Sequence, residues 1–217
     1  MKKTPLAFIL FLSFAMSLSA WEHNLGLEAG FPCISLRAND DGNKNIFEPA
    51  LQARYYGVAE NGFCLSAAIG AGLPISKDFT LNGESATAKG FGMNLALGAG
   101  YEFPLSQRLT LAALGSLSLD WLRFSYKKEF KAALSEGYAT ADWTQTDDAL
   151  FAGIGAEVLA RFFLTDQLSL SASCALRFID GGTLWKNGSK IGRDYDNSQN
   201  LRGNIIFTPT LGACWTF

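Results

Sequence analysis

The sequence predicts an all-β fold, an eight-stranded antiparallel up-and-down transmembrane β-barrel. The first observation is the C-terminal stretch Gly203–Phe217, where apolar residues alternate with small or polar ones at the two-residue period of a β-strand. The second is composition, because 48% of the residues are hydrophobic, only 18% are charged and 22 are glycines. The third is that the apolar stretches beyond residue 20 alternate, and none is long enough for a transmembrane helix.

The N-terminus predicts a signal peptide over residues 1–20, followed by one barrel domain over residues 21–217. Lys2 and Lys3 form a basic start, residues 5–16 form a short apolar run, and residues 17–20 offer small side chains for cleavage. Cleavage after Ser19 and cleavage after Ala20 both remain open. We therefore expect an exported chain, and its formal net charge of −2 argues against a nucleic-acid partner.

Eight strands are expected, each recognised by its two-residue period and bounded by turn residues. The third is the cleanest, with alternating apolar residues from Phe63 to Ile75. Glu60-Asn61-Gly62 is a tight hairpin signal, and residues 104–108 and 165–167 are short turns. In order, the expected strands are Glu22–Arg37, Ile46–Ala59, Phe63–Ile75, Gly90–Phe103, Leu109–Phe124, Ala149–Leu164, Leu168–Asp180 and the C-terminal stretch.

The connections alternate between long and short, which places both ends of the barrel domain on the side of the short turns. The expected long loops cover residues 38–45, 76–89, 125–148 and 181–202. Within the third, Lys127–Gly137 could form a short amphipathic helix, with Phe130, Ala133 and Leu134 on one side. An unstructured exposed loop fits that stretch equally well.

Alternation alone does not say which face points outward, since a soluble barrel of the lipocalin kind would hold its apolar face inside. Side-chain volume decides, because the interior of an eight-stranded barrel is just wide enough for side chains to fill it. One face carries Leu, Phe, Ile, Trp and Tyr on every strand, whereas the other is mostly Gly, Ala and Ser. We expect the large side chains to face lipid and the small ones to line the lumen.

The expected lumen face also carries charges, which must be paired or hydrated in so narrow a space. Counted from the short-turn side, Arg54 and Glu157 lie at similar depth, as do Glu28 and Arg161 below them and Asp120 and Arg177 above. Two interpretations stay open, a structural plug of ion pairs and a narrow polar path whose pairs exchange. The six candidate residues are Glu28, Arg54, Asp120, Glu157, Arg161 and Arg177.

Toward the long-loop side, the inward face becomes apolar. We predict an apolar mouth there, either a route for small hydrophobic compounds or the packed upper core of a closed barrel. Its candidate residues are Ile34, Leu36, Leu122, Phe124, Phe151, Ile179 and Ile206.

The four cysteines are expected to be free thiols. Cys33 and Cys174 fall on the lipid face, while Cys64 and Cys214 fall on the lumen face of strands that are not neighbours, too far apart for a disulfide. With a single histidine and no Cys-x-x-Cys pair, the sequence supports neither a metal site nor a cofactor site.

A last strand that ends on an aromatic residue resembles the closing strand of bacterial outer-membrane β-barrels. The strand pattern of the whole barrel domain resembles the small OmpW, OmpX and OmpA-transmembrane-domain barrels. The resemblance implies an integral outer-membrane location, with membrane lipid and the barrel-assembly machinery as partners. It also implies an assembly signal formed by Phe207, Leu211, Trp215 and Phe217.

Two functions follow from the resemblance. One is a narrow channel for small compounds, hydrophobic ones included, as in the OmpW type. The other is a non-conducting barrel whose loops bind host or matrix molecules. We do not expect an enzyme, because a lipid-modifying barrel needs a histidine beside its nucleophile. The single histidine, His23, is expected at the end of the barrel away from the outer leaflet.

Overall fold

The computed structural model describes residues 21–38, 42–81, 84–134, 137–190, 193–201 and 205–217, and only part of the side chains at the far end of the longest strands. The proposed signal peptide lies outside these ranges. The described chain forms one sheet of twelve strands. In chain order they are β1 (Trp21–Gly30), β2 (Cys33–Ala38), β3 (Gly42–Phe47), β4 (Ala50–Ala59), β5 (Phe63–Gly72), β6 (Ile75–Leu81), β7 (Glu84–Pro104), β8 (Leu109–Leu134), β9 (Gly137–Phe163), β10 (Leu168–Lys190), β11 (Arg193–Leu201) and β12 (Ile205–Thr216).

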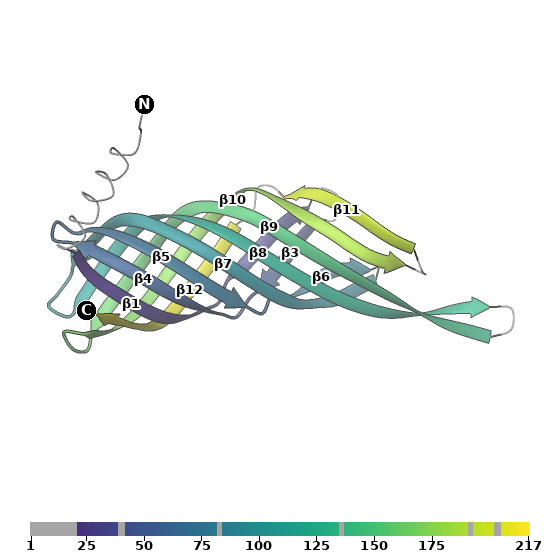
Figure 1. Ribbon diagram of the computed structural model, residues 1–217, viewed down its shortest axis with the longest axis horizontal. Helices are drawn as coiled ribbons and strands as arrows, with labels where there is room; N and C mark the ends of the chain where they lie inside the picture. Colours follow the sequence, from purple (N-terminus) through teal and green to yellow (C-terminus); the bar gives the residue numbers. More distant parts are fainter. Residues whose placement is uncertain (1–20, 39–41, 82–83, 135–136, 191–192, 202–204) are drawn as a thin grey trace, which may run out of the picture.

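Eight of these strands pair in a closed ring. Starting from β1, antiparallel pairs join β1 to β4, β4 to β5, β5 to β7 and β7 to β8. They continue from β8 through β9 and β10 to β12, which pairs back onto β1. The predicted eight-stranded antiparallel barrel is therefore confirmed, with neighbouring strands tilted across the barrel axis (Figure 1).

Of the four additional strands, β11 pairs with β10 inside a predicted loop, and the other three arise because predicted strands are interrupted at prolines. The breaks fall at Pro32 between β1 and β2, at Pro49 between β3 and β4, and at Pro74 between β5 and β6. With Pro209 on β12 they form a proline row across neighbouring strands. The row is joined by backbone bonds from Phe31 N to Pro209 O (3.0 Å), Glu48 N to Pro32 O (2.9 Å), Leu73 N to Pro49 O (2.9 Å) and Gly90 N to Pro74 O (3.0 Å).

Each bond in the proline row stands where an ordinary antiparallel ladder can make two. A proline has no N–H group, so it accepts a bond from its neighbour and cannot return one. The row thus divides the barrel wall into a lower part, and an upper part that β2, β3 and β6 continue. There β2 pairs with β3 over six residues, whereas the pairing of β6 with β7 is irregular. In the upper part the registered contact between β3 and β6 is the single pair Phe47–Ile75.

The two faces of the wall match the prediction from side-chain volume. Large apolar residues are exposed on the outside, whereas the inside buries serines and small residues. These exposed apolar residues form a continuous outer surface, called here the belt, which suits a barrel embedded in a lipid bilayer. Its exposed members include Leu25, Leu27, Leu51, Ile69, Leu95, Leu97, Leu117, Leu119, Ile154, Val158, Leu170, Leu176 and Leu211.

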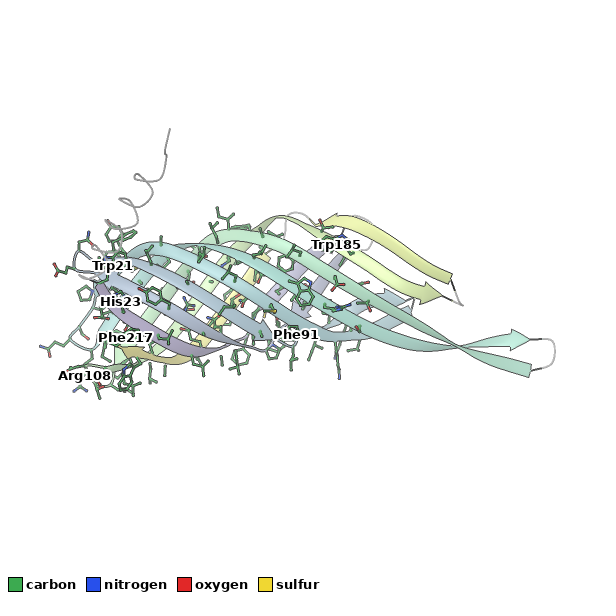
Figure 2. The ribbon with its side chains drawn as sticks, in the orientation of Figure 1. Trp21, His23, Phe91, Arg108, Trp185 and Phe217 are labelled. Atoms are coloured by element: carbon green, nitrogen blue, oxygen red, sulfur yellow. The ribbon has the colours of Figure 1, made fainter. Side chains whose placement is uncertain are left out.

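The short turns gather at one end of the barrel, called here the short-turn end. They join β4 to β5, β7 to β8 and β9 to β10. The predicted Glu60-Asn61-Gly62 hairpin is present, with Gly62 at a φ of 84°, a conformation that favours glycine. Trp21, His23, Arg108 and Phe217 lie together at this end, far from Trp185 near the other (Figure 2).

The four predicted long loops are largely wrong, because the strands continue through them. β8 and β9 pair from Leu109 to Leu134, so Lys127–Leu134 is neither a helix nor an unstructured loop. A short helix is costly to nucleate, whereas each residue of this hairpin pairs with a partner strand that contains several threonines. Among the described residues, no helix is both long enough and apolar enough to cross a membrane.

Candidate functional site

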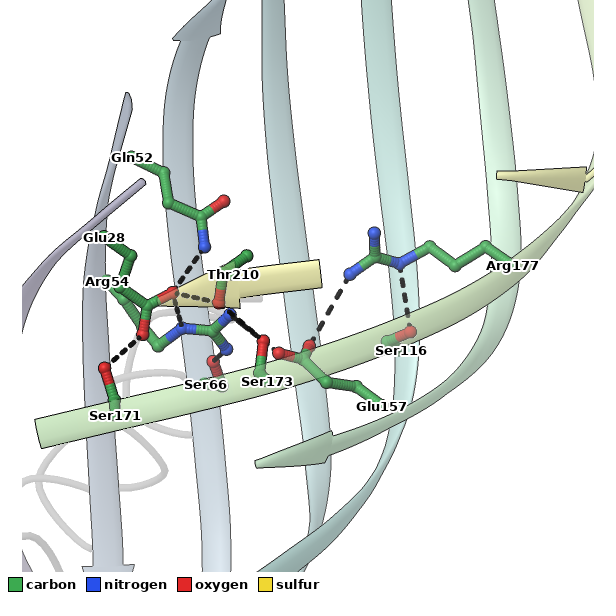
Figure 3. A network of polar contacts seen from close by, with 10 residues as sticks. All are labelled: Glu28, Gln52, Arg54, Ser66, Ser116, Glu157, Ser171, Ser173, Arg177 and Thr210. Atoms are coloured by element: carbon green, nitrogen blue, oxygen red, sulfur yellow. Dashed lines mark hydrogen bonds and ion pairs between the residues drawn. The ribbon is translucent and has the colours of Figure 1, made fainter. Parts of the chain in front are cut away.

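Arg54 is the centre of a buried polar network in the lower lumen, the part of the interior between the short-turn end and Asp120 (Figure 3). Its Nε lies 3.0 Å from Glu28 Oε2 and its Nη2 lies 2.7 Å from Glu157 Oε1. Its Nη1 donates to Ser66 Oγ at 2.9 Å. The structure therefore brings together Arg54 and Glu157, which the sequence placed at similar depth, and adds Glu28 to the pair.

Glu28 is surrounded by hydrogen-bond donors from several strands. Gln52 Nε2 donates to its carboxylate at 2.6 Å, Ser171 Oγ at 3.0 Å and Thr210 Oγ1 at 3.1 Å. A buried ion pair is tolerated only when its remaining lone pairs are satisfied in this way. The inward serines and threonines thus hold the charges in place rather than lining an open tube.

The network continues upward through Glu157, whose second oxygen lies 3.6 Å from Arg177 Nη2. Arg177 Nε also donates to Ser116 Oγ at 3.1 Å. Asp120, expected beside Arg177, accepts a hydrogen bond from Ser118 Oγ at 2.7 Å and interacts electrostatically with Arg177. Negative and positive groups therefore alternate along the lower lumen, from Glu28 to Asp120.

Arg161 does not pair with Glu28, although the two were expected at similar depth. Its guanidinium lies 3.1 Å from Glu22 and 2.8 Å from Glu102, and it sits over the Tyr56 ring at 4.8 Å. These partners lie nearer the short-turn end than Glu28 does. Glu102 was not among the predicted lumen residues, although its place one residue after the outward Tyr101 put it on the lumen face.

Above the lower lumen lies an apolar cluster, in which each residue is nearly completely buried. Six of the seven predicted mouth residues belong to it, and the side chain of the seventh, Leu36, lies outside the described part. Four further members of the cluster were not predicted, namely Ile46, Ala88, Ala149 and Leu184. Its members are Ile34, Ile46, Ala88, Leu122, Phe124, Ala149, Phe151, Ile179, Leu184 and Ile206.

A pocket of about 540 Å³ opens in the barrel wall directly above the proline row, and is called here the wall pocket. It lies where β2, β3 and β6 meet, beside the single Phe47–Ile75 pair. Its volume falls within the range of ordinary small-molecule sites. The lining residues include outward ones and two members of the apolar cluster: Cys33, Ile34, Ser35, Asn45, Ile46, Phe47, Ile75, Ser76 and Lys77.

The four residues of the predicted assembly signal lie along the C-terminal strand and at its end. Phe207, Leu211, Trp215 and Phe217 are all exposed on the outer face of the barrel. His23 stacks against Phe217 with ring centroids 6.3 Å apart, and its Nδ1 lies 2.7 Å from Tyr55 Oη. The assembly signal stays a prediction, since exposure alone does not test it.

The remaining sequence predictions concern thiols and metals. Cys33 and Cys174 are exposed on the outer face, Cys64 and Cys214 are buried inside, and all four are free. Among the described residues, no group of three or more His, Cys, Asp or Glu side chains is placed to hold a metal ion.

Comparison with known proteins supports the fold. No family model and no curated protein matches the sequence. The crystal structure of a major outer membrane protein from Thermus thermophilus is 16% identical, with a TM-score of 0.62, over 91% of this chain and 100% of that one. The outer membrane protein OprG from Pseudomonas aeruginosa is 10% identical, with a TM-score of 0.56, over 91% of this chain and 96% of that one. The predicted resemblance is confirmed, and at these identities it shows a shared fold.

Proposed function

We propose that this chain is an integral outer-membrane barrel that carries small apolar compounds through its upper half and releases them sideways into the membrane. The observation that carries the proposal is the wall pocket, which reaches Ile34 and Ile46 of the buried apolar cluster from the lipid-facing side. The long strands would face the outside of the cell, as in barrels with short turns on the periplasmic side.

The lower lumen argues against a straight passage for such compounds. Arg54, Glu157 and Arg177 are nearly completely buried, and their charged groups are held by ion pairs and hydrogen bonds. An apolar molecule entering this region would separate buried charges without offering them a partner, which costs several kcal/mol for each ion. A sideways exit above the network avoids that cost.

The proline row makes the upper wall the easier part to open. Between β3 and β6 the ladder is reduced to the Phe47–Ile75 pair. Ser76 Oγ also donates to Asn45 O at 2.7 Å across the same gap. Few backbone bonds therefore need to break for a compound to pass between these strands, and the exposed side chains beyond them face lipid.

A reversible disulfide across the gap tests this route. In a chain whose four cysteines are replaced by alanine, Asn45→Cys and Lys77→Cys introduce a pair across the wall pocket. Cells producing the chain would be assayed for uptake of N-phenyl-1-naphthylamine, an apolar dye that fluoresces in lipid. We expect oxidation to remove most of the uptake and a reductant to restore it.

The control is Leu51→Cys with Ala71→Cys, a registered pair in the lower wall between β4 and β5. Its oxidation should leave uptake unchanged, because that part of the ladder does not open. If oxidation of the cysteine pair at the wall pocket leaves dye uptake unchanged, the sideways route is refuted.

A second function is favoured by the long hairpin that projects beyond the belt (Figure 1). The last pair between β7 and β8 joins Lys89 to Ser125, and the last pair between β10 and β9 joins Ser189 to Thr144. Beyond these pairs, the described residues of β8 and β9 pair only with each other. Two open strand edges outside the membrane suit binding of a host or matrix protein. Replacing residues 127–143 with a short turn should abolish such binding and spare dye uptake.

Neither role requires catalysis, and we propose that the protein is not an enzyme. His23 is placed at the short-turn end beside Tyr55 and Phe217, distant from the apolar cluster. A His23→Ala variant should retain dye uptake, while lipid modification by the purified protein would contradict this assignment.

A further inference from the structure

Glu48 is a buried carboxyl group on the inner face, at the base of the apolar cluster. It follows Ile46 by two residues on the same face, so both side chains point inward while Phe47 between them points to lipid. Only 6% of Glu48 is exposed. Among the described residues no arginine or lysine forms an ion pair with it, and no group donates a hydrogen bond to its carboxyl.

Two glycines create the space that Glu48 occupies. A Cβ atom on Gly72 would come within 2.8 Å of Glu48 Cδ, and one on Gly92 within 2.9 Å of the same atom. The Gly92 position also approaches Leu122 Cδ2 at 2.8 Å, so the carboxyl group lies beside a member of the apolar cluster. Glu48 is therefore directed across the interior toward β5 and β7, beneath the cluster.

The nearest charges do not compensate Glu48. Asp120 is close enough to repel it electrostatically. Arg177, which interacts electrostatically with Asp120, already contacts Glu157 and Ser116. An ionised carboxylate buried without a partner costs several kcal/mol, and a second carboxylate beside it adds to that cost. A positive group placed beside Glu48 would offset that cost.

We propose that Glu48, with Asp120, binds the ammonium group of a small apolar amine whose apolar part lies against Ile34 and Ile46. This inference deepens the proposed function and rests on it, since the wall pocket gives the amine its way in. A protonated amine supplies both missing elements, a positive charge and N–H donors for two carboxylates. Its apolar part replaces lipid contacts with contacts to isoleucine side chains.

Binding of two matched fluorescent probes tests the inference. 1-Naphthylmethylamine is positively charged at neutral pH, and 1-naphthylmethanol is a neutral analogue of nearly the same shape. Fluorescence anisotropy would be followed with the mature chain in a nonionic detergent, with empty micelles subtracted. We expect Glu48→Gln to raise the Kd of the amine by about tenfold or more, as loss of a charge-assisted hydrogen bond does. The Kd of the alcohol should stay nearly the same.

Two further variants complete the test. Asp120→Asn should also raise the Kd of the amine. This second variant shows whether the effect of Glu48→Gln is more than a local disturbance of the structure at Glu48. Glu60→Gln removes the same charge from an exposed turn at the short-turn end, and should change neither Kd. A difference in electrophoretic migration between unheated and heated samples of each variant would verify that it folds.

The outcomes separate the two proposals. If the amine binds the unaltered chain and Glu48→Gln leaves its Kd unchanged, the amine site is refuted. If the alcohol binds as well as the amine and no acidic variant affects either, the apolar route stands without selection for a cation. If neither probe binds the unaltered chain, the apolar route fails, and the amine site fails with it.

Discussion

The lower and upper halves of this barrel differ in how their walls are paired and in what they enclose. Below the proline row, β1, β4 and β5 pair continuously and enclose charges whose partners come from several strands. Above it, β3 meets β6 through a single registered pair, and the wall encloses apolar side chains. A barrel of this size can therefore close its lumen with side chains and still keep a weakly paired place in its wall.

The largest expected effect comes from breaking the lower network. Arg54→Met would leave Glu28 and Glu157 buried without their shared partner, and should lower the free energy of unfolding by about 3–5 kcal/mol. Urea titration of the folded chain in detergent measures this change. The control is Arg123→Met, whose exposed side chain lies 3.7 Å from Asp148. Its cost should stay below about 1 kcal/mol, and equal costs would contradict a buried network.

The next effect concerns the belt that both halves share. Leu97 is exposed near the middle of the wall, so Leu97→Arg should destabilise the barrel in a lipid bilayer by about 2–4 kcal/mol. Leu105 is equally exposed but lies in a short turn, and Leu105→Arg should cost about 0–1 kcal/mol. Similar costs in urea titrations from vesicles would mean that the belt does not face hydrocarbon.

The smallest expected effect tests whether the proline row weakens the upper wall. Pro74→Ala supplies an N–H group opposite Gly90, and should raise the free energy of local opening there by about 0.5–1.5 kcal/mol. Hydrogen exchange of the neighbouring amides measures it. The total free energy of unfolding should change by less than about 1 kcal/mol, because alanine is also freer in the unfolded chain. In the control Pro104→Ala, exchange around Gly90 should stay the same; unchanged exchange in Pro74→Ala would show that the row does not weaken the wall.

The sequence predicts the membrane-embedded part of the barrel well. There, one face of each strand contacts lipid, so alternation and side-chain volume determine strand positions, as in Phe63–Ile75. Beyond the belt both faces of a strand can carry polar residues, so the period-two signal disappears. That is why Lys127–Leu134 reads as a helix or loop although β8 and β9 continue through it.

Parts of the candidate site were less predictable. The inward direction of Arg54 and Glu157 follows from alternation, and so does their depth. The partner of Arg161 does not, because a long guanidinium reaches residues on several strands, and Glu102 was available as well as Glu28. Glu48 was missed because it stands beside Pro49, where the strand pattern breaks and the side-chain direction is ambiguous.

The most direct measurement is the position of a heavy-atom-labelled apolar compound inside the folded barrel. Crystals of the mature chain soaked with 1-bromonaphthalene would reveal the bromine by anomalous scattering. We expect bromine in the wall pocket, against Ile34, Ile46 and Ile75. Bromine among Arg54, Glu157 and Arg177 would contradict it, because the compound would then be using the lower lumen.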